Sequence, residues 1–276
     1  MKIALYQART GIDPDANAQD LVAAIKEAAE GGAGMLFTPE MSGLLDRDRE
    51  RAQAAMQDEA GDRVLASVRA AAAEAGIWVH LGSLALKGER PDGRFVNRGF
   101  VIDDRCEIRA RYDKIHLFDV DLATGESWRE SAVYGAGERA VAVSTPAGMM
   151  GVTICYDLRF PDLYRALTDA GATILSVPAA FTVPTGEAHW HILLRARAIE
   201  AGAFVIAAAQ SGTHQDGRKT YGHSLVVDPW GKVLFDMGEG NGVGFAEIDL
   251  EEVSRVRSRL PAIRHRRPIA APDVTQ

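Results

Sequence analysis

The chain has 276 residues, of which 47% are hydrophobic and 25% are charged, a composition typical of a globular protein with one large or two small domains. Its 31 Lys and Arg against 38 Asp and Glu give a formal charge of −7, which argues against a nucleic-acid partner because a phosphate backbone requires a positive face. No stretch approaches the roughly 18 apolar residues of a membrane span, so no membrane partner is expected.

The cysteines and the first residues predict a cytoplasmic location. Cys106 and Cys155 show no paired spacing, which favours a reducing compartment. The apolar run of the opening segment "MKIALYQA" is too short for a signal peptide, and the segment is typical of a strand.

Strand-like and helix-like segments alternate along the first half, as in layered α/β structure. The helix expected at 15–32 carries Leu21, Ile25 and Ala28 on one stripe and ends at Gly31. The other elements expected in this half are a helix at 62–75 and strands at 2–8, 35–38, 76–86, 96–103 and 107–114.

The second half repeats this alternation. We expect strands at 151–155, 172–178 and 203–210, helices at 161–170 and 187–201, and closing antiparallel strands within 222–236 and 242–250. The segment "GEGNGVG" at 238–244 lacks the third glycine of a dinucleotide-binding motif and is interpreted as a hairpin loop.

No linker-like segment divides the halves, so the chain is predicted to form one α/β domain over 1–276. Its tail, from about 260 to 276, is expected to be extended and to lie at a subunit contact. The basic segment 255–268 follows acidic residues and favours a solvated or subunit-contacting tail over a phosphate site.

Cys155 ends the apolar run "GVTIC", and Pro161 suits the first turn of the helix that follows. The thiol is therefore expected in a tight strand-to-helix turn, where a helix N-terminus lowers a thiol pKa and favours the nucleophilic thiolate. Taken alone, however, Cys155 fits a small apolar filler better than a nucleophile.

Lys114 and Glu40 also place charge at strand ends. In "EIRARYDK" the alternation of the strand puts Lys114 on the apolar face, which is costly unless a carboxylate meets the amine or the amine has a chemical task. Glu40 follows a short buried strand and a proline. A snorkelling lysine and a surface acid remain open alternatives.

Side chains at the carboxyl ends of strands converge at one edge of a sheet, so a carboxylate, an amine and a thiol can form one active site. Their chemistry suits acyl transfer. Glu40 would take the thiol proton and Cys155 would attack a carbonyl. Lys114 and the backbone N–H of Tyr156 would stabilise the developing oxyanion.

Five segments together resemble the nitrilase superfamily of carbon–nitrogen hydrolases and cover nearly the whole chain in the family's order: "FTPEMSG", "YDKIHLFDVDL", "GVTICYDLRFPDLYRAL", "AHWHILLRARAIEAGAFVIAAAQ" and "YGHSLVVDPWG". The resemblance implies a single-domain, four-layer αββα sandwich that hydrolyses an amide through a cysteine thioester. It implies Glu40, Lys114 and Cys155 as base, lysine and nucleophile, and Glu130 as a second glutamate that positions the lysine or the substrate.

Within the superfamily, the chain is most similar to the deaminated-glutathione amidases, with the ω-amidases that act on 2-oxoglutaramate close behind. N-Carbamoyl and nitrile hydrolysis, and an inactive binding protein of the same fold, are the alternatives. Both favoured substrates carry carboxylates, which makes Arg159 the candidate cation, although Arg159 could instead pair with Asp157 or Glu187. Glu187 stands where such relatives have proline, and an acid near the pocket would disfavour an anion. The predicted substrate-binding residues are Tyr156, Arg159, Phe181, Thr185 and His189.

No metal and no cofactor are expected. His189 and His191 are two residues apart, and on a helix such residues point to different faces and cannot share one ion. The expected partners are a small-molecule amide and further copies of the chain, because the resemblance implies a homodimer or larger homo-oligomer.

Overall fold

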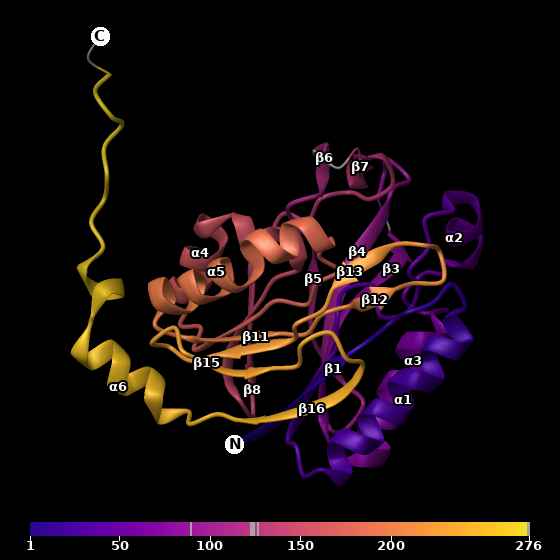
Figure 1. Cartoon of the computed structure of the whole chain (residues 1–276), viewed down its shortest axis with the longest axis horizontal. Helices are drawn as coiled ribbons and strands as arrows, with labels where there is room; N and C mark the ends of the chain where they lie inside the picture. The colour runs from indigo at the N-terminus through magenta and orange to yellow at the C-terminus, as the bar shows by residue number, and fades with distance from the viewer. Residues whose placement is uncertain (89, 122–124, 126, 275–276) are drawn as a thin grey trace.

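The computed structural model describes residues 1–88, 90–121, 125 and 127–274. Two six-stranded sheets stack face to face, and helices cover the outer face of each sheet (Figure 1). The predicted four-layer αββα sandwich is therefore confirmed.

The first sheet has the strand order β16-β1-β2-β3-β4-β5. Neighbours β1, β2 and β3 run parallel, whereas β4, β5 and β16 pair antiparallel to their neighbours. The bounds are β1 Lys2–Gln7, β2 Met35–Phe37, β3 Trp78–Lys87, β4 Phe95–Ile102, β5 Ile108–Asp113 and β16 Gly242–Glu247.

The second sheet has the order β15-β14-β11-β10-β9-β8, with β9, β10 and β11 parallel. Its bounds are β8 Val141–Thr145, β9 Gly148–Val152, β10 Ile174–Ser176, β11 Phe204–Ala207, β14 Leu225–Val227 and β15 Val233–Asp236. Two small antiparallel pairs lie outside the sheets: β6 Asp119–Asp121 with β7 Ser127–Arg129, and β12 Ser211–Thr213 with β13 Lys219–Tyr221.

Helices α1 and α3 cover the first sheet, and α4 and α5 cover the second (Figure 1). Side chains of Asp13 and Asp62 cap the first turns of α1 and α3, which satisfies backbone N–H groups that have no partner inside the helix. The bounds are α1 Pro14–Glu30, α2 Arg49–Ala55, α3 Arg63–Ala75, α4 Pro161–Asp169, α5 Val183–Ala201 and α6 Glu251–Arg259, with 3₁₀ turns η1 Glu130–Ala132, η2 Cys155–Arg159 and η3 Ala262–His265.

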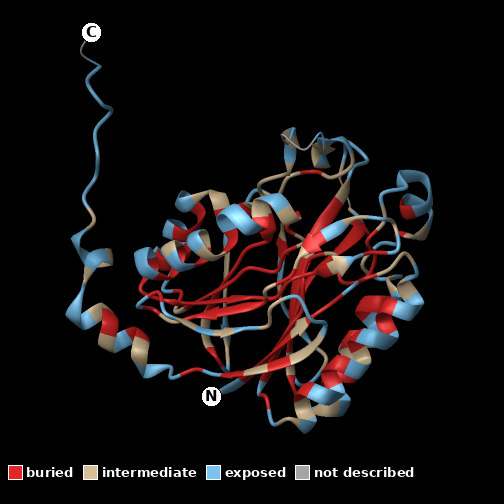
Figure 2. Cartoon of the chain, in the orientation of Figure 1, coloured by how far each residue is buried: buried red, intermediate tan, exposed pale blue. Residues whose placement is uncertain are grey.

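Strand alternation explains the two layers of the core. Ile3 and Leu5 of β1 pack between the sheets, whereas Ala4 packs under α1 and α3. Figure 2 shows the central strands of both sheets buried, with exposed residues on the outer faces of the helices. Strands β2, β10, β11 and β14 are buried throughout because both of their faces are covered, whereas the edge strands β5 and β15 also carry exposed residues.

Two predictions about the second half are wrong in detail. Helix α5 begins at Val183 rather than at 187, because Pro184 fits the first helical turn, where a backbone N–H is not needed. The glycine-rich segment 238–244 is not a hairpin loop. It leads from β15 of the second sheet to β16, which pairs with β1 in the first sheet.

The C-terminal tail contains η3 and then runs away from the body of the protein to residue 274 (Figure 1). Arg266 ties its start to α4 through an ion pair of 2.6 Å with Asp169. None of the helices in the described residues is long and apolar enough to cross a membrane.

Candidate active site

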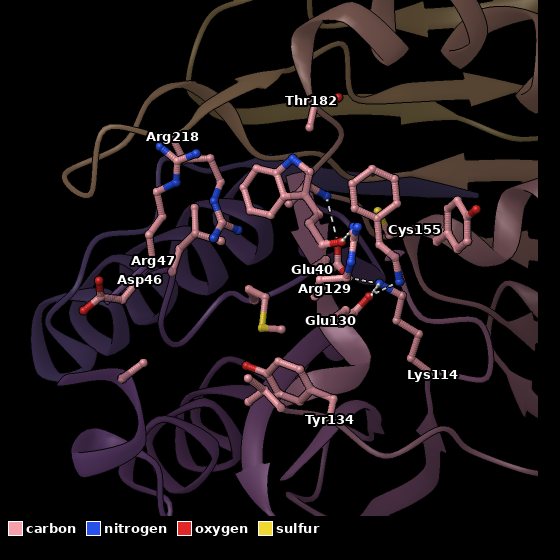
Figure 3. A pocket seen from close by; sticks show the side chains of 18 of the residues that line it. Glu40, Asp46, Arg47, Lys114, Arg129, Glu130, Tyr134, Cys155, Thr182 and Arg218 are labelled. Atoms are coloured by element: carbon pink, nitrogen blue, oxygen red, sulfur yellow. Dashed lines mark hydrogen bonds and ion pairs between the residues drawn. The ribbon is translucent and has the colours of Figure 1, made fainter. Parts of the chain in front are cut away.

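A pocket of about 290 Å³ lies where strands of both sheets end, and residues of α2 and β7 complete its wall. Glu40, Lys114, Glu130 and Cys155 lie side by side in it (Figure 3). Glu40 and Lys114 follow strands of the first sheet, and Cys155 follows a strand of the second. The three residues predicted from separate strand ends therefore meet in one place.

Glu40 is buried and held by both sheets. Its Oε1 accepts hydrogen bonds from Lys114 Nζ at 2.8 Å and from Asn97 Nδ2 at 3.0 Å, and its Oε2 accepts one from the backbone N–H of Ala180 at 3.0 Å. Gln210 Nε2 donates to the Glu40 carbonyl at 2.9 Å. The carboxylate is thus fixed in place rather than solvated.

A glycine makes this arrangement possible. A Cβ on Gly82 in β3 would overlap the carbonyl oxygens of Thr38 and Pro39, which precede Glu40. Only glycine lets β3 pass this close to the chain that carries the carboxylate.

Lys114 is only 2% exposed and sits between two carboxylates. Its Nζ donates to Glu40 Oε1 and to Glu130 Oε2, both at 2.8 Å. Glu130 begins η1, where its Oε2 also accepts a hydrogen bond of 2.7 Å from the backbone N–H of Phe118. Two acids around one ammonium compensate the cost of burying the charge.

Cys155 begins η2, and its backbone has a φ of 50°, a conformation that is uncommon outside glycine. The buried carboxylate of Asp157 holds this turn. It accepts hydrogen bonds from the backbone N–H of Ile154 at 2.9 Å, from Tyr112 Oη at 2.7 Å and from the backbone N–H of His116 at 3.0 Å. The thiol is therefore presented from a strained but well-anchored turn.

The charges of the site define its resting protonation. Burial alone would raise the pKa of Glu40, but the Lys114 ammonium and hydrogen bonds from Lys114, Cys155 and Asn97 hold it below its ordinary value. Burial lowers the pKa of Lys114, yet Glu130 and Glu40 raise it well above its ordinary value. Glu40 is thus ionised and Lys114 charged at neutral pH.

The expectation that the turn lowers the thiol pKa is wrong. Burial and the neighbouring Glu40 carboxylate raise the pKa of Cys155 well above 9.0, and the opposing effect of Lys114 is smaller. The resting cysteine is a thiol beside a carboxylate that can take its proton.

The predicted substrate-binding residues also gather here. Tyr156, Phe181 and Thr185 line the pocket together with Arg159. His189 lies just behind Arg159, with its Nδ1 at 3.2 Å from Arg159 Nη2.

Arg159 does not form either ion pair considered from the sequence. Asp157 bonds to the turn that carries Cys155, and the exposed Glu187 is not among the residues that line the pocket. The Arg159 guanidinium instead lies over the rings of Tyr156 and Phe181, at 5.8 Å and 5.6 Å from their centroids. It faces the pocket beside aromatic surface.

Sequence reasoning missed a second basic cluster in the pocket. Arg47 and Arg218 both lie over the ring of Trp128, at 5.3 Å and 4.7 Å from its centroid. They stand together on one side of the pocket, away from Cys155 (Figure 3). Arg218 follows the turn between β12 and β13, and no local motif signals that this turn reaches the pocket.

Asn97 was missed as well. Its Nδ2 donates to both Glu40 and Glu130, at 3.0 Å and 3.1 Å. Asn97 lies in β4, most of which is buried. A polar residue within an apolar strand segment was the signal that could have found it.

A buried thiol, an ammonium group and two carboxylates converge in one pocket of an αββα sandwich, an arrangement suited to hydrolysis. The chain belongs to the carbon–nitrogen hydrolase family, whose sequence model matches residues 2–258.

Relatives agree with this assignment. The chain is 40% identical over 269 residues to the deaminated glutathione amidase of Bos taurus, covering 96% of this chain and 82% of that protein. The crystal structure of Saccharomyces cerevisiae Nit3, described as a member of branch 10 of the nitrilase superfamily, has a TM-score of 0.84 at 27% identity and covers 95% of this chain and 94% of that one.

A mutant of the amidase from Nesterenkonia sp. AN1, with acrylamide added to its active-site cysteine, has a TM-score of 0.78 at 27% identity and covers 95% of this chain and 98% of that one. The predicted superfamily and the predicted enzyme class, a carbon–nitrogen hydrolase, are confirmed.

Proposed function

We propose that the protein hydrolyses a carboxylate-bearing amide through a thioester on Cys155. The observation that carries the proposal is the hydrogen-bonded contact of Lys114 with both Glu40 and Glu130 in the pocket that also holds the thiol. The active-site cysteine of the similar Nesterenkonia amidase, which reacts with acrylamide, supports Cys155 as the nucleophile.

In the first half-reaction, Cys155 Sγ attacks the amide carbon while Glu40 takes the thiol proton. Lys114 and the backbone N–H of Tyr156 stabilise the negative charge that forms on the amide oxygen. The intermediate collapses, the C–N bond breaks, and the amine leaves with the proton held by Glu40.

In the second half-reaction, water attacks the thioester carbon and gives a proton to Glu40. The C–S bond then breaks, the carboxylic acid is released, and the Cys155 sulfur recovers its proton from Glu40. Glu130 keeps Lys114 charged and oriented throughout, because it accepts two hydrogen bonds from the ammonium.

The arginines of the pocket support an anionic substrate. Among the ion pairs found in the described residues, neither Arg47 nor Arg159 has a carboxylate partner, so both can bind one from a ligand. Arg159 and the Arg47–Arg218 cluster provide two separate cationic positions.

Deaminated glutathione, after which the Bos taurus relative is named, carries two carboxylates. We propose it as the substrate, and 2-oxoglutaramate, a shorter compound with one carboxylate, as the second candidate. Glu187 does not count against either substrate because it does not line the pocket.

The test compares product formation by mass spectrometry from deaminated glutathione, 2-oxoglutaramate, an N-carbamoyl amino acid and a nitrile. We expect deaminated glutathione to have the highest kcat/KM and a folded Cys155→Ala variant to be inactive. Turnover by folded Cys155→Ala would reject the mechanism. A lack of turnover with all four compounds would favour the binding-protein alternative.

Arg47→Gln tests the substrate assignment separately, because Arg47 has no carboxylate partner among the ion pairs of the described residues, whereas Arg218 Nε lies 3.7 Å from Asp216 Oδ2. We expect kcat/KM for deaminated glutathione to fall about tenfold or more, with a smaller change for 2-oxoglutaramate, because a lost hydrogen bond between charged groups is worth about 1.5–3 kcal/mol. Arg63→Gln, an exposed arginine of α3, is the matched control. Equal losses with both substrates would contradict a role for Arg47 in binding the second carboxylate of deaminated glutathione, which 2-oxoglutaramate lacks.

We further propose that the protein is a cytoplasmic homodimer. Large apolar side chains are exposed along α5 and beside it: Ile192 at 68%, Ile199 at 47%, Trp230 at 62% and Leu260 at 52%. Ile199, Trp230 and Leu260 line one hollow, and exposed apolar surface of this kind favours a protein partner. The unpaired thiols of Cys106 and Cys155 suit a reducing compartment.

A further inference from the structure

A second group of chemically active side chains lies outside the pocket. His191 on α5, His223 before β14 and Asp236 at the end of β15 place one ligand-type atom each within 4.8 Å of one another. Asp236 Oδ2 is 3.0 Å from His191 Nε2, and Asp236 Oδ1 is 2.9 Å from His223 Nδ1. None of the three lines the pocket.

The backbone around this group is fixed. His223 has a φ of 56°, and its N–H donates to the Gly238 carbonyl at 2.8 Å. Its own carbonyl accepts a hydrogen bond of 2.8 Å from the indole N–H of Trp190, the neighbour of His191 on α5. Asp236 is paired with Leu225 across the β14–β15 ladder. The three side chains therefore converge from anchored positions, which limits the entropy lost when a ligand orders them further.

The carboxylate of Asp236 faces two imidazoles, and the ring of Tyr221 stacks on His223 with their centroids 4.5 Å apart. Among the ion pairs of the described residues, Asp236 meets only the two histidines and no lysine or arginine. A cation at this point would meet a favourable field.

We propose that His191, His223 and Asp236 bind one divalent late transition-metal ion such as Zn²⁺. Two imidazole nitrogens and one carboxylate oxygen are a ligand set that Zn²⁺ accepts at about 2.0–2.2 Å, with water in the remaining position. Mg²⁺ prefers oxygen ligands and is not expected to compete.

The ion would join α5 to the β14–β15 pair. Trp190 on α5 packs against Phe181 of the pocket, with ring centroids 4.7 Å apart. The expected effect of the ion is to stabilise the fold on this side, since a ligand that binds only the folded state raises the melting temperature.

This site is compatible with the prediction that His189 and His191 cannot share an ion. Their rings diverge, because His189 faces Arg159 and His191 faces Asp236. The sequence expectation of no metal considered only neighbouring histidines, whereas the partners of His191 here are 32 and 45 residues further along the chain.

The test is a calorimetric titration of untagged, metal-free protein with Zn²⁺. We expect one strong site per chain in the wild type. His191→Ala and the isosteric Asp236→Asn are expected to weaken it about tenfold or more, while His189→Ala, two residues away on the same helix, keeps it. Zn²⁺ should raise the melting temperature of the wild type and of His189→Ala but not of His191→Ala.

Cys155→Ala separates this site from zinc bound by the pocket thiol, and we expect it to retain the strong site. Loss of strong binding in Cys155→Ala would overturn the proposal. Unchanged affinity in His191→Ala, or the absence of any strong Zn²⁺ site in the wild type, would do so too. Metal-free circular dichroism and melting curves show whether each variant is folded.

Discussion

The Cys155 thiol keeps its proton at rest. This site therefore differs from one in which a cysteine thiolate is paired with an imidazolium. A thiolate pair stores an activated nucleophile at rest, whereas here the thiol is neutral and Glu40 is ionised. In the proposed mechanism, Cys155 is activated only when the substrate is in place, because Glu40 removes its proton during attack. A neutral buried thiol is also protected from unwanted oxidation.

The activity is therefore expected to change little with pH around neutrality. Glu40 must be ionised and Cys155 protonated, and the site shifts their pKa values outward from 4.5 and 9.0. We expect kcat/KM to stay level between pH 4.5 and 9.0 and to decrease only at more acidic or more alkaline pH. Measurement of kcat/KM across this range checks the prediction, and a half-maximal point near neutrality would contradict it.

Stability must be followed in the same buffers. Because folding lowers the pKa of Glu40, its ionisation stabilises the fold above pH 4.5, and this contribution is lost as the pH falls through the lower folded value. Melting curves at each pH separate unfolding from a change in the chemistry of the site.

Among the single residues of the site, the sequence predicted those that carry a charge at a position expected to be buried. Lys114 and Glu40 stood out because alternation and a preceding buried strand implied burial. Glu130 came only from the family resemblance. Arg47 and Arg218 could not be predicted, because an arginine in a loop is ordinary until the fold shows where the loop lies.

Among the structural elements, the turn η2 carries Cys155, the proposed nucleophile. Asp157 ties it to Tyr112 at the end of β5 and to His116 in the segment after Lys114. The Asp157 carboxylate therefore connects the turn of Cys155 to the strand that precedes Lys114. This connection fixes the position of the Cys155 thiol relative to the Lys114 amine.

We expect Asp157→Asn to lower kcat more than it raises KM and to destabilise the fold by about 2 kcal/mol, since an amide oxygen cannot replace all of these hydrogen bonds to a charged acceptor. Steady-state kinetics and denaturant unfolding measure both effects. Asp162→Asn, an exposed acid in the first turn of α4, is the control. Equal effects of the two variants would show that Asp157 does not position the turn.

The sequence predicted most regular elements because burial repeats every second residue in strands and every third or fourth in helices. It missed α2, a short helix with one buried residue, Ala52, and so without a clear apolar stripe. It also missed the helix α6 and the short strands β6, β7, β8, β12 and β13. It also assigned the segment 238–244 to a hairpin, since local turn residues do not reveal which sheet receives the next strand.

For the whole molecule, the exposed apolar residues on the outer face of α5 predict association of chains. We expect light scattering to give a mass of about twice 29.7 kDa. Ile199→Glu should reduce it toward one chain, because a buried unpaired charge opposes association. Ala23→Glu on α1, in the opposite outer layer, adds the same charge and should leave the mass unchanged. A wild-type mass of one chain would reject the dimer.

The division of the reactive groups between the two sheets has a consequence for how the protein could be taken apart. Glu40, Lys114 and Glu130 precede β8, whereas Cys155 and the Ala180 N–H that holds Glu40 follow it. A chain cut before β8 would leave acids and amine in one fragment and the nucleophile in the other. Because β16 from the second fragment completes the sheet of the first, the fragments have a surface on which to reassociate. Hydrolysis would then act as a complementation signal that only the reassembled sandwich can produce.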